Sequence, residues 1–198
     1  EQQRILGVFP NFYISYAKNA APLTPKQKFQ LAWRSQIDPM TLVFTGITAG
    51  VEQSGNTPAS WGQGGSGFAK RYAAAYGDGL TDTFLAGAIF PSIFHQDPRY
   101  FYKGTGTIRS RIWYAISSAV ICRADNGRRQ FNYSGLMGDL SSAGLSNLYY
   151  PADDRNSIGL TLRNLGIGKA TQAGQNILQE FVIKHFTPRL PKDSSLNP

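Results

Sequence analysis

Short apolar stretches that carry glycine and alanine at helical spacing constrain this chain more than any other feature. In residues 38–53, apolar side chains recur at steps of three and four residues, while small residues lie one turn apart. This spacing predicts an amphipathic helix with a groove of small residues that lets another helix approach closely. Three further stretches repeat the pattern, and the predicted packing positions are Gly46, Gly50, Gly87, Gly135 and Gly138.

The helix signals together predict an all-α fold, a single-domain bundle of about six or seven helices. Thr24-Pro25 and Asp38-Pro39 each supply an N-cap and a first-turn proline, so two helices meet at a tight corner. The later helices are expected at 67–76, 80–90, 109–123 (with Ile112, Ile116, Ala119 and Val120 facing inward), 134–148 capped by Ser134, and about 157–186. Its glycines predict a kink or break in the last of these helices.

Three parts of the chain are expected. Residues 1–23 form an extended aromatic N-terminal arm, which either folds over its own core or docks onto a neighbouring molecule. Residues 24–186 form the helical domain, and residues 187–198 form a polar C-terminal tail.

The composition and the start of the chain indicate which partners and which cellular location to expect. The 198 residues carry a net charge of +8, which attracts polyanions such as nucleic acid, anionic lipid or acidic glycan without choosing among them. Because we expect an exported protein, anionic envelope lipid or glycan is the expected ligand, and nucleic acid is not. The chain begins at Glu1 without a methionine, as a protein does after its signal peptide is removed, and a truncated chain would begin the same way. We therefore expect an exported protein that is periplasmic, envelope-associated or extracellular. No stretch reaches the roughly 18 to 20 apolar residues of a spanning helix, so an integral membrane protein is not expected.

The sharpest enzymatic candidate is Glu52, which begins the segment Glu-Gln-Ser-Gly-Asn-Thr-Pro-Ala-Ser at the end of an apolar helix. The segment resembles the lysozyme-like lytic transglycosylases, and this resemblance implies that Glu52 is a general acid acting on peptidoglycan. Gln53 replaces the serine of that motif, and Thr57 separates its asparagine from its proline. The alternative is an exposed polar residue at a helix end, and our leading interpretation contains no catalytic residue.

Aromatic and basic residues mark candidate contact surfaces. Trp61 lies between glycines, where it either meets a sugar or partner or plugs the end of the bundle, and we favour the plug. The predicted interaction residues are Phe9, Phe12, Tyr13, Trp61, Arg99, Tyr100, Phe101, Tyr102 and Lys103. His95 and Asp97 lack the spacing of a metal site and no phosphate-binding loop is present, so neither a metal nor a cofactor is predicted.

Several motifs spread over the chain carry a wider resemblance: Trp-Gly-Gln-Gly at 61–64, Gln-Asp-Pro-Arg-Tyr-Phe at 96–101, Asn-Tyr-Ser at 132–134 and Tyr-Tyr-Pro at 149–151. With these motifs the chain resembles a family of exported hypothetical proteins from soil-type bacteria. The resemblance implies export and a single compact unit, and it supplies no catalytic residue.

The sequence thus predicts a non-enzymatic, exported structural protein that acts by self-association, at the cell envelope or as an extracellular filament or tube. One alternative is a peptidoglycan-cleaving enzyme that uses Glu52. The other is a peripheral module that binds lipid or anionic glycan through the basic stretch at 99–129.

Overall fold

The computed structural model describes residues 4–5, 9–17, 20–155 and 158–186, which are mostly helical with three small sheets. The helices are α1 (Pro25–Gln36), α2 (Pro39–Ser54), α3 (Gly64–Phe84), α4 (Phe90–Ile93), α5 (Ile108–Ser117), α6 (Tyr133–Ser146) and α7 (Ile158–Phe181). A π-helical turn, η2 (Leu85–Ile89), joins α3 to α4 without a break, so these two elements form one long helix. Within the described residues the domain therefore has six main helices, as predicted.

The sheets are minor elements that the all-α prediction missed. Strands β1 (Arg4–Ile5) and β2 (Phe9–Pro10) form an antiparallel pair, and β3 (Ile14–Ser15) pairs in parallel with β5 (Tyr100–Phe101). The third sheet has the antiparallel order β4 (Gln96–Asp97), β6 (Ile121–Ala124), β7 (Arg129–Phe131). Strands of two to four residues leave almost no periodic signal in a sequence.

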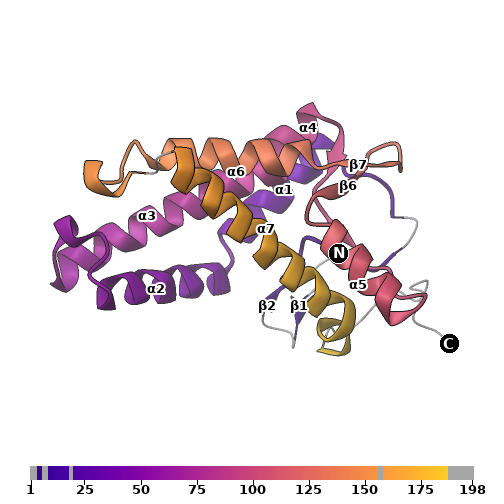
Figure 1. The fold of residues 1–198 in the computed structure, drawn as a ribbon, viewed down its shortest axis with the longest axis horizontal. Helices are drawn as coiled ribbons and strands as arrows, with labels where there is room; N and C mark the ends of the chain where they lie inside the picture. Colours follow the sequence, from indigo (N-terminus) through magenta and orange to yellow (C-terminus); the bar gives the residue numbers. More distant parts are fainter. Residues whose placement is uncertain (1–3, 6–8, 18–19, 156–157, 187–198) are drawn as a thin grey trace.

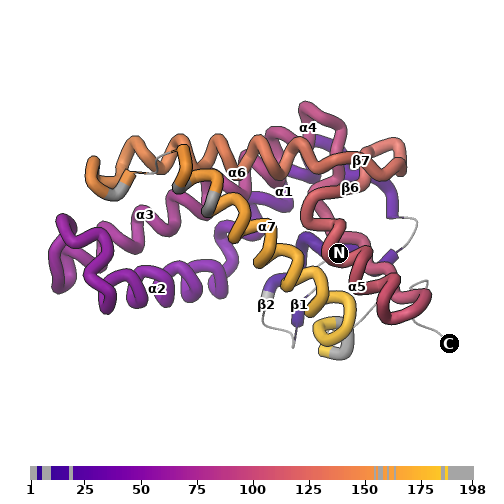
Figure 2. Tube along the Cα trace, viewed as in Figure 1, coloured from indigo at the N-terminus to yellow at the C-terminus, as the bar shows by residue number. Residues whose placement is uncertain are grey.

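The helices form two layers around a polar interior. Figure 1 shows α3 between α2 and α6, with α7 crossing diagonally in front of them toward α5. The tube in Figure 2 shows the N-terminal segment, in indigo, following the right-hand half of the domain before α1 begins. Because β3 pairs with β5 and Tyr16 is fully buried, the described part of the predicted arm folds over its own domain. The predicted tail at 187–198 lies outside the described residues.

The predicted helix starts are confirmed for α1 and α2. Thr24 forms a capping box with Gln27, and the Asp38 carboxylate accepts from the Met40 amide at 2.9 Å. For α6 the prediction is wrong, because Asn132 is the cap and accepts from the Gly135 amide at 2.8 Å. Ser134 instead lies inside the helix, where its hydroxyl donates to the buried Gln96.

Three further helix predictions differ from the structure. The gap expected at 77–79, where Gly-Asp-Gly separates the helices predicted at 67–76 and 80–90, is absent, since α3 runs as one helix from Gly64 to Phe84. The helix α7 has no break at its glycines, each of which costs only about 1 kcal/mol relative to alanine. Finally, α5 ends at Ser117, because residues 121–124 pair as strand β6 between β4 and β7.

The five predicted packing glycines lie in different surroundings. A Cβ on Gly138 would lie 2.5 Å from the backbone of Ala86, and one on Gly87 would lie 2.5 Å from the Tyr13 hydroxyl. Gly135 makes room for the Asn132 cap, and Gly46 lies beside the Tyr72 ring. A Cβ on Gly50 would meet nothing within 4 Å, so the predicted groove on α2 is open at this position.

Replacing Gly138 by alanine is expected to destabilise the domain by about 1 to 3 kcal/mol, because the added methyl group would force α6 away from η2. The matched control is Gly144→Ala on the same helix, where a Cβ meets nothing within 4 Å and stability is expected to hold or rise. Urea unfolding measures both variants. Equal stabilities of the two variants would contradict the close packing of α6 on η2.

Candidate functional site

The interior of the domain is polar and its exterior is rich in large apolar side chains. The largest fully buried side chains include Arg71, Lys28, Gln96, Glu180 and Asp97. Many large apolar side chains face outward instead, among them Ile47 at 55% exposure, Trp113 at 70% and Leu148 at 77%. Charged residues are rarely buried in soluble domains, and monomers rarely expose apolar surface on this scale.

The apolar stripes found in the sequence therefore form outer faces. The stripe of α1 (Phe29, Trp33, Ile37) and that of α2 (Val43, Ile47, Val51) are exposed. The prediction that Ile116 and Val120 face inward is wrong, because both are exposed. The reason is that alanines fill the close helix contacts, with Ala32, Ala49, Ala88 and Ala115 fully buried, and leave no room for larger side chains there.

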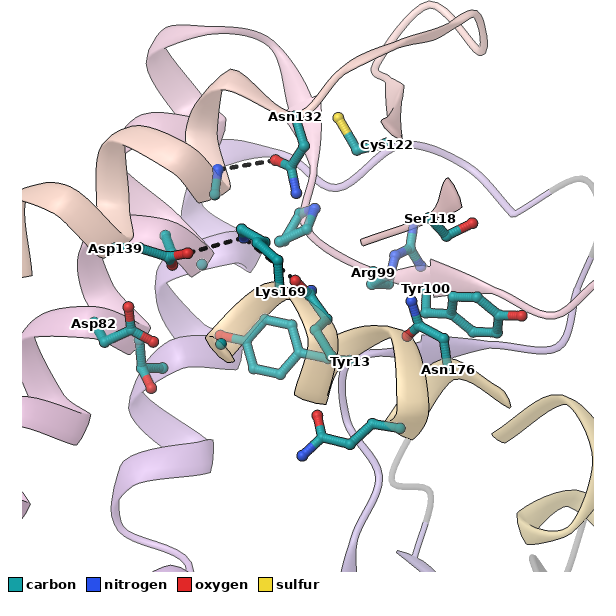
Figure 3. A pocket seen from close by; sticks show the side chains of 18 of the residues that line it. Tyr13, Asp82, Arg99, Tyr100, Ser118, Cys122, Asn132, Asp139, Lys169 and Asn176 are labelled. Atoms are coloured by element: carbon teal, nitrogen blue, oxygen red, sulfur yellow. Dashed lines mark hydrogen bonds and ion pairs between the residues drawn. The ribbon is translucent and has the colours of Figure 1, made fainter. Parts of the chain in front are cut away.

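A cavity of about 1310 Å³ lies between α7 on one side and α3, α6 and the N-terminal arm on the other. Figure 3 shows Asp82, Asp139, Lys169, Tyr13 and Asn176 around it. Much of its lining is polar, because the inner face of α7 carries a polar stripe at helical spacing: Lys169, Gln172, Asn176 and Gln179. That spacing was the one signal in the sequence that could have located the cavity.

Three side chains from three helices meet in this cavity. Asp82 of α3 lies near Asp139 of α6, and the Lys169 ammonium of α7 lies 2.9 Å from the Asp139 carboxylate. Burial and, after it, the Asp139 charge together raise the pKa of Asp82 to about 6, while Lys169 opposes both effects. Asp82 lies one turn before the π-helical η2, and such turns are frequent at functional sites.

The N-terminal arm places Tyr13 on the wall of the same cavity, near Asp82. Burial raises the pKa of the Tyr13 hydroxyl well above its usual value, and the nearby Asp82 charge adds to the shift. The Tyr13 hydroxyl is buried and has no hydrogen-bond partner among the described residues. Tyr13 was predicted as a contact residue for a partner, and the structure places it on the wall of this cavity, which is open to solvent.

Glu52 lies at the end of α2, beside a carboxylate that the sequence did not suggest. Burial raises its pKa, the Asp78 charge adds to this effect, and Arg71 opposes it. The Tyr150 hydroxyl donates to the Asp78 carboxylate at 3.0 Å, and Tyr149 donates to the same group. Among the described residues, the lining of the large cavity includes Asp78 and excludes Glu52, so the two carboxyl groups do not share that space.

Trp61 packs on Tyr150 with their ring centroids 5.3 Å apart, at the end of the bundle that holds Glu52. Trp61, Lys70, Gly77 and Tyr149 also line a smaller pocket of about 320 Å³. The indole therefore both covers the bundle end and borders an open space.

The basic and aromatic segment at 99–103 is tied into the domain. Tyr100 and Tyr102 are buried, and the Tyr100 hydroxyl donates to Glu180 at 2.8 Å. Arg99 pairs with Asp97 at 2.7 Å, and Lys103 donates to the Ser110 hydroxyl at 2.6 Å. Phe101 lies under the guanidinium groups of Arg99 and Arg123, and Phe12 lies under that of Arg4. The side chain of Phe9 lies outside the described residues.

Asp97 and His95 form no metal site here, since Asp97 receives the backbone amide and guanidinium of Arg99. Across the part of the chain that the structure describes, no group of three or more His, Cys, Asp or Glu is placed to hold a metal ion. Among the described residues, no helix combines the length and apolar character needed to cross a membrane. Comparisons with protein-family models, curated proteins and solved structures give no match.

Proposed function

We propose that this protein is a non-enzymatic structural protein that works by self-association. The observation that carries the proposal is the outward direction of its large apolar side chains over several helices. Burying apolar surface stabilises an assembly by about 25 cal/mol per Å², so faces of this kind favour contact with other molecules. Copies of the same chain are the partner that every molecule of the protein can supply.

Two faces support an open assembly over a closed dimer. Val43, Ile47 and Val51 are exposed on α2, and Met137, Leu145 and Leu148 are exposed on α6 and in the turn that follows it. These are two different surfaces, because α3 lies between α2 and α6 (Figure 1). Two different surfaces on one chain favour head-to-tail contacts, which repeat into a filament or tube when the rotation does not close.

The small residues of α2 support a helix as the occupant of that face. Gly50 has open space where its side chain would be, next to the exposed Val51. A helix of a neighbouring molecule can approach the α2 backbone closely at this point. Export to the cell envelope or the exterior, and attraction of the +8 charge to anionic lipid or glycan there, remain part of the proposal.

Sedimentation velocity over a concentration series, with electron microscopy of the same samples, tests self-association. We expect species larger than the monomer, and we expect Ile47→Glu to weaken association at least about tenfold, because an unpaired charge is costly to bury. The matched control is Ser66→Glu, which adds the same charge at an exposed position outside both faces. A wild-type protein that stays monomeric at high concentration, or that associates only with liposomes, would contradict the proposal.

A further inference from the structure

One side of α5 is apolar and exposed, at the right-hand end of the domain in Figure 1. Trp113 is 70% exposed, and Ile116 and Val120 follow it at steps of three and four residues, so the three side chains lie on one side of the helix and of the turn after it. Arg109 lies one turn before Trp113 on the same side, and it is also exposed. An apolar side that carries a tryptophan and a base is therefore open to solvent here.

The strand β7 extends this surface. The Arg129 guanidinium donates to the Ser117 hydroxyl of α5 at 3.1 Å, so the side of β7 that carries Arg129 lies against the helix. Phe131, two residues later, lies on the same side of the strand and is exposed. The exposed Tyr133 ring follows, with its centroid 5.2 Å from that of Phe131. The α5–β7 face consists of Trp113, Ile116, Val120, Phe131 and Tyr133.

The charge around the α5–β7 face is positive. The bases of residues 108–133 are Arg109, Arg111, Arg123, Arg128 and Arg129. The one acid of this segment, Asp125, is paired with the buried Lys28 at 2.9 Å. Arg109 and Arg128 are exposed, and no acid within the described part of the chain lies within ion-pair distance of either. These two guanidinium groups can therefore meet an anionic ligand without breaking an existing ion pair.

We propose that the α5–β7 face binds the surface of a membrane that contains anionic lipid. In the bound state Trp113 and Tyr133 lie at the level of the headgroups, where tryptophan and tyrosine rings are enriched in membrane proteins. Arg109 and Arg128 lie against the lipid phosphates. An apolar side with tryptophan, bordered by bases, is typical of helices that lie in the plane of a membrane surface.

A lipid surface fits this face better than a soluble polyanion or a second copy of the chain. Nucleic acid or an acidic glycan neutralises the arginines but leaves Trp113, Ile116 and Phe131 in contact with water, whereas the hydrocarbon boundary of a bilayer covers them. Two copies that met through this face would bring the same arginines together, and like charges across an interface are unfavourable. The five side chains of the face line neither of the two cavities described above, so they do not form the wall around a small molecule there.

Lipid and protein contacts fall on different parts of the domain, and the lipid contact rests on the proposed location at the cell envelope. Residues 39–54, which form α2, contain no Lys or Arg and a single acid, Glu52. Figure 1 shows α2 and α5 toward opposite ends of the long axis of the domain. Association through α2 therefore leaves the α5–β7 face uncovered.

Co-sedimentation with lipid vesicles tests the proposal, with vesicles of equal parts phosphatidylglycerol and phosphatidylcholine and with vesicles of phosphatidylcholine alone. We expect binding to the mixed vesicles to be at least about tenfold stronger, since only these present an anionic surface to the arginines. Trp113→Ser should weaken this binding at least about tenfold, because it removes the largest exposed ring from the interface. The matched control is Trp33→Ser, which removes an indole that is 56% exposed on α1 and should leave the affinity unchanged.

The two exposed arginines give an independent readout. Arg109→Gln and Arg128→Gln should each weaken binding to the mixed vesicles about fivefold at low salt, and the loss should shrink as salt screens the surface charge. Arg34→Gln is the matched control, because Arg34 is exposed on α1 and its replacement should not change the affinity. Equal losses in all three variants would assign the attraction to the net charge of the whole protein and overturn the assignment to this face.

Other outcomes would also overturn the proposal: equal binding to the two kinds of vesicle, equal losses in Trp113→Ser and Trp33→Ser, or capture by heparin beads without binding to vesicles, which would assign the arginines to a soluble polyanion. The loss in Trp113→Ser should persist in the Ile47→Glu background, in which self-association is weakened. A protein that stays monomeric would therefore leave the lipid result intact, and a protein that assembles without binding vesicles would leave the proposed self-association intact.

Discussion

Replacing Glu180 by leucine is expected to destabilise the domain by about 3 to 5 kcal/mol, the usual cost of removing one partner of a buried ion pair. Glu180 is fully buried on α7, and its carboxylate accepts from the Arg111 guanidinium at 2.9 Å and from the Tyr100 hydroxyl at 2.8 Å. It also accepts from the backbone amides of Lys103 and Gly104. Its loss would leave the Arg111 Nε, the Tyr100 hydroxyl and two backbone amides without this carboxylate acceptor.

Thermal unfolding followed by circular dichroism measures the effect. For a domain of this size the expected loss corresponds to a midpoint lower by about 6 to 20 °C. Asp153→Leu is the control, because it removes an exposed acid and should change the midpoint little. Glu180→Gln should lie between wild type and Glu180→Leu, since an amide keeps one acceptor and loses the charge. A midpoint unchanged in Glu180→Leu would mean that α7 is not anchored through this carboxylate.

The sequence predicted local structure best where a few neighbouring residues decide it. Thr24 and Asp38 cap helices through contacts with residues two and three positions later, and Pro25 and Pro39 reinforce both starts. Capping signals between residues so close in the sequence do not depend on the tertiary structure. The Gly-Asp-Gly at 77–79 failed as a stop signal because packing of α2 and α6 on α3 outweighs the helix cost of two glycines.

Local sequence patterns could not predict whether the apolar stripes face the interior or the solvent. A stripe such as Val43, Ile47 and Val51 shows which face of a helix is apolar, and burial inside the same domain is only one way to cover that face. Here the inner positions are taken by alanine and by bonded polar groups such as Lys28, which donates to the Pro91 carbonyl and to Asp125. Pro91 and Asp125 lie far from Lys28 in the sequence, so no periodic pattern predicts these contacts.

The candidate site could not be predicted from the sequence for a similar reason. Asp82, Asp139 and Lys169 come from three helices separated by about thirty to sixty residues, and each alone has the pattern of a solvent-exposed charge. Only the fold brings them together beside Gln36. The segment at 99–103 shows the opposite case, because its conspicuous local pattern of bases and aromatics serves internal bonds to Glu180, Asp97 and Ser110.

Replacing Arg71 by methionine is expected to cost as much as the loss of Glu180, about 3 to 5 kcal/mol, although its partners are mostly neutral. Arg71 is fully buried on α3 and donates to the carbonyl oxygens of Thr57, Pro58 and Gly62 at 2.7 to 2.8 Å. It also donates to the side chain of Gln53. One guanidinium thus bonds three carbonyl oxygens of the loop between α2 and α3, and methionine fills its space without any donor.

The neighbouring Lys70→Met is the matched control, since Lys70 is exposed on the same helix and should tolerate the same substitution within about 0.5 kcal/mol. Urea unfolding measures the global effect, and hydrogen exchange of residues 55–62 separates it from local release of the loop. Because Trp61 lies in this loop and Glu52 lies just before it, the Arg71 variant should also disturb the end of the bundle. An equal loss of stability in both variants would show that the loop is held by something other than the guanidinium, and that the buried charge of Arg71 is not what orders this end of the domain.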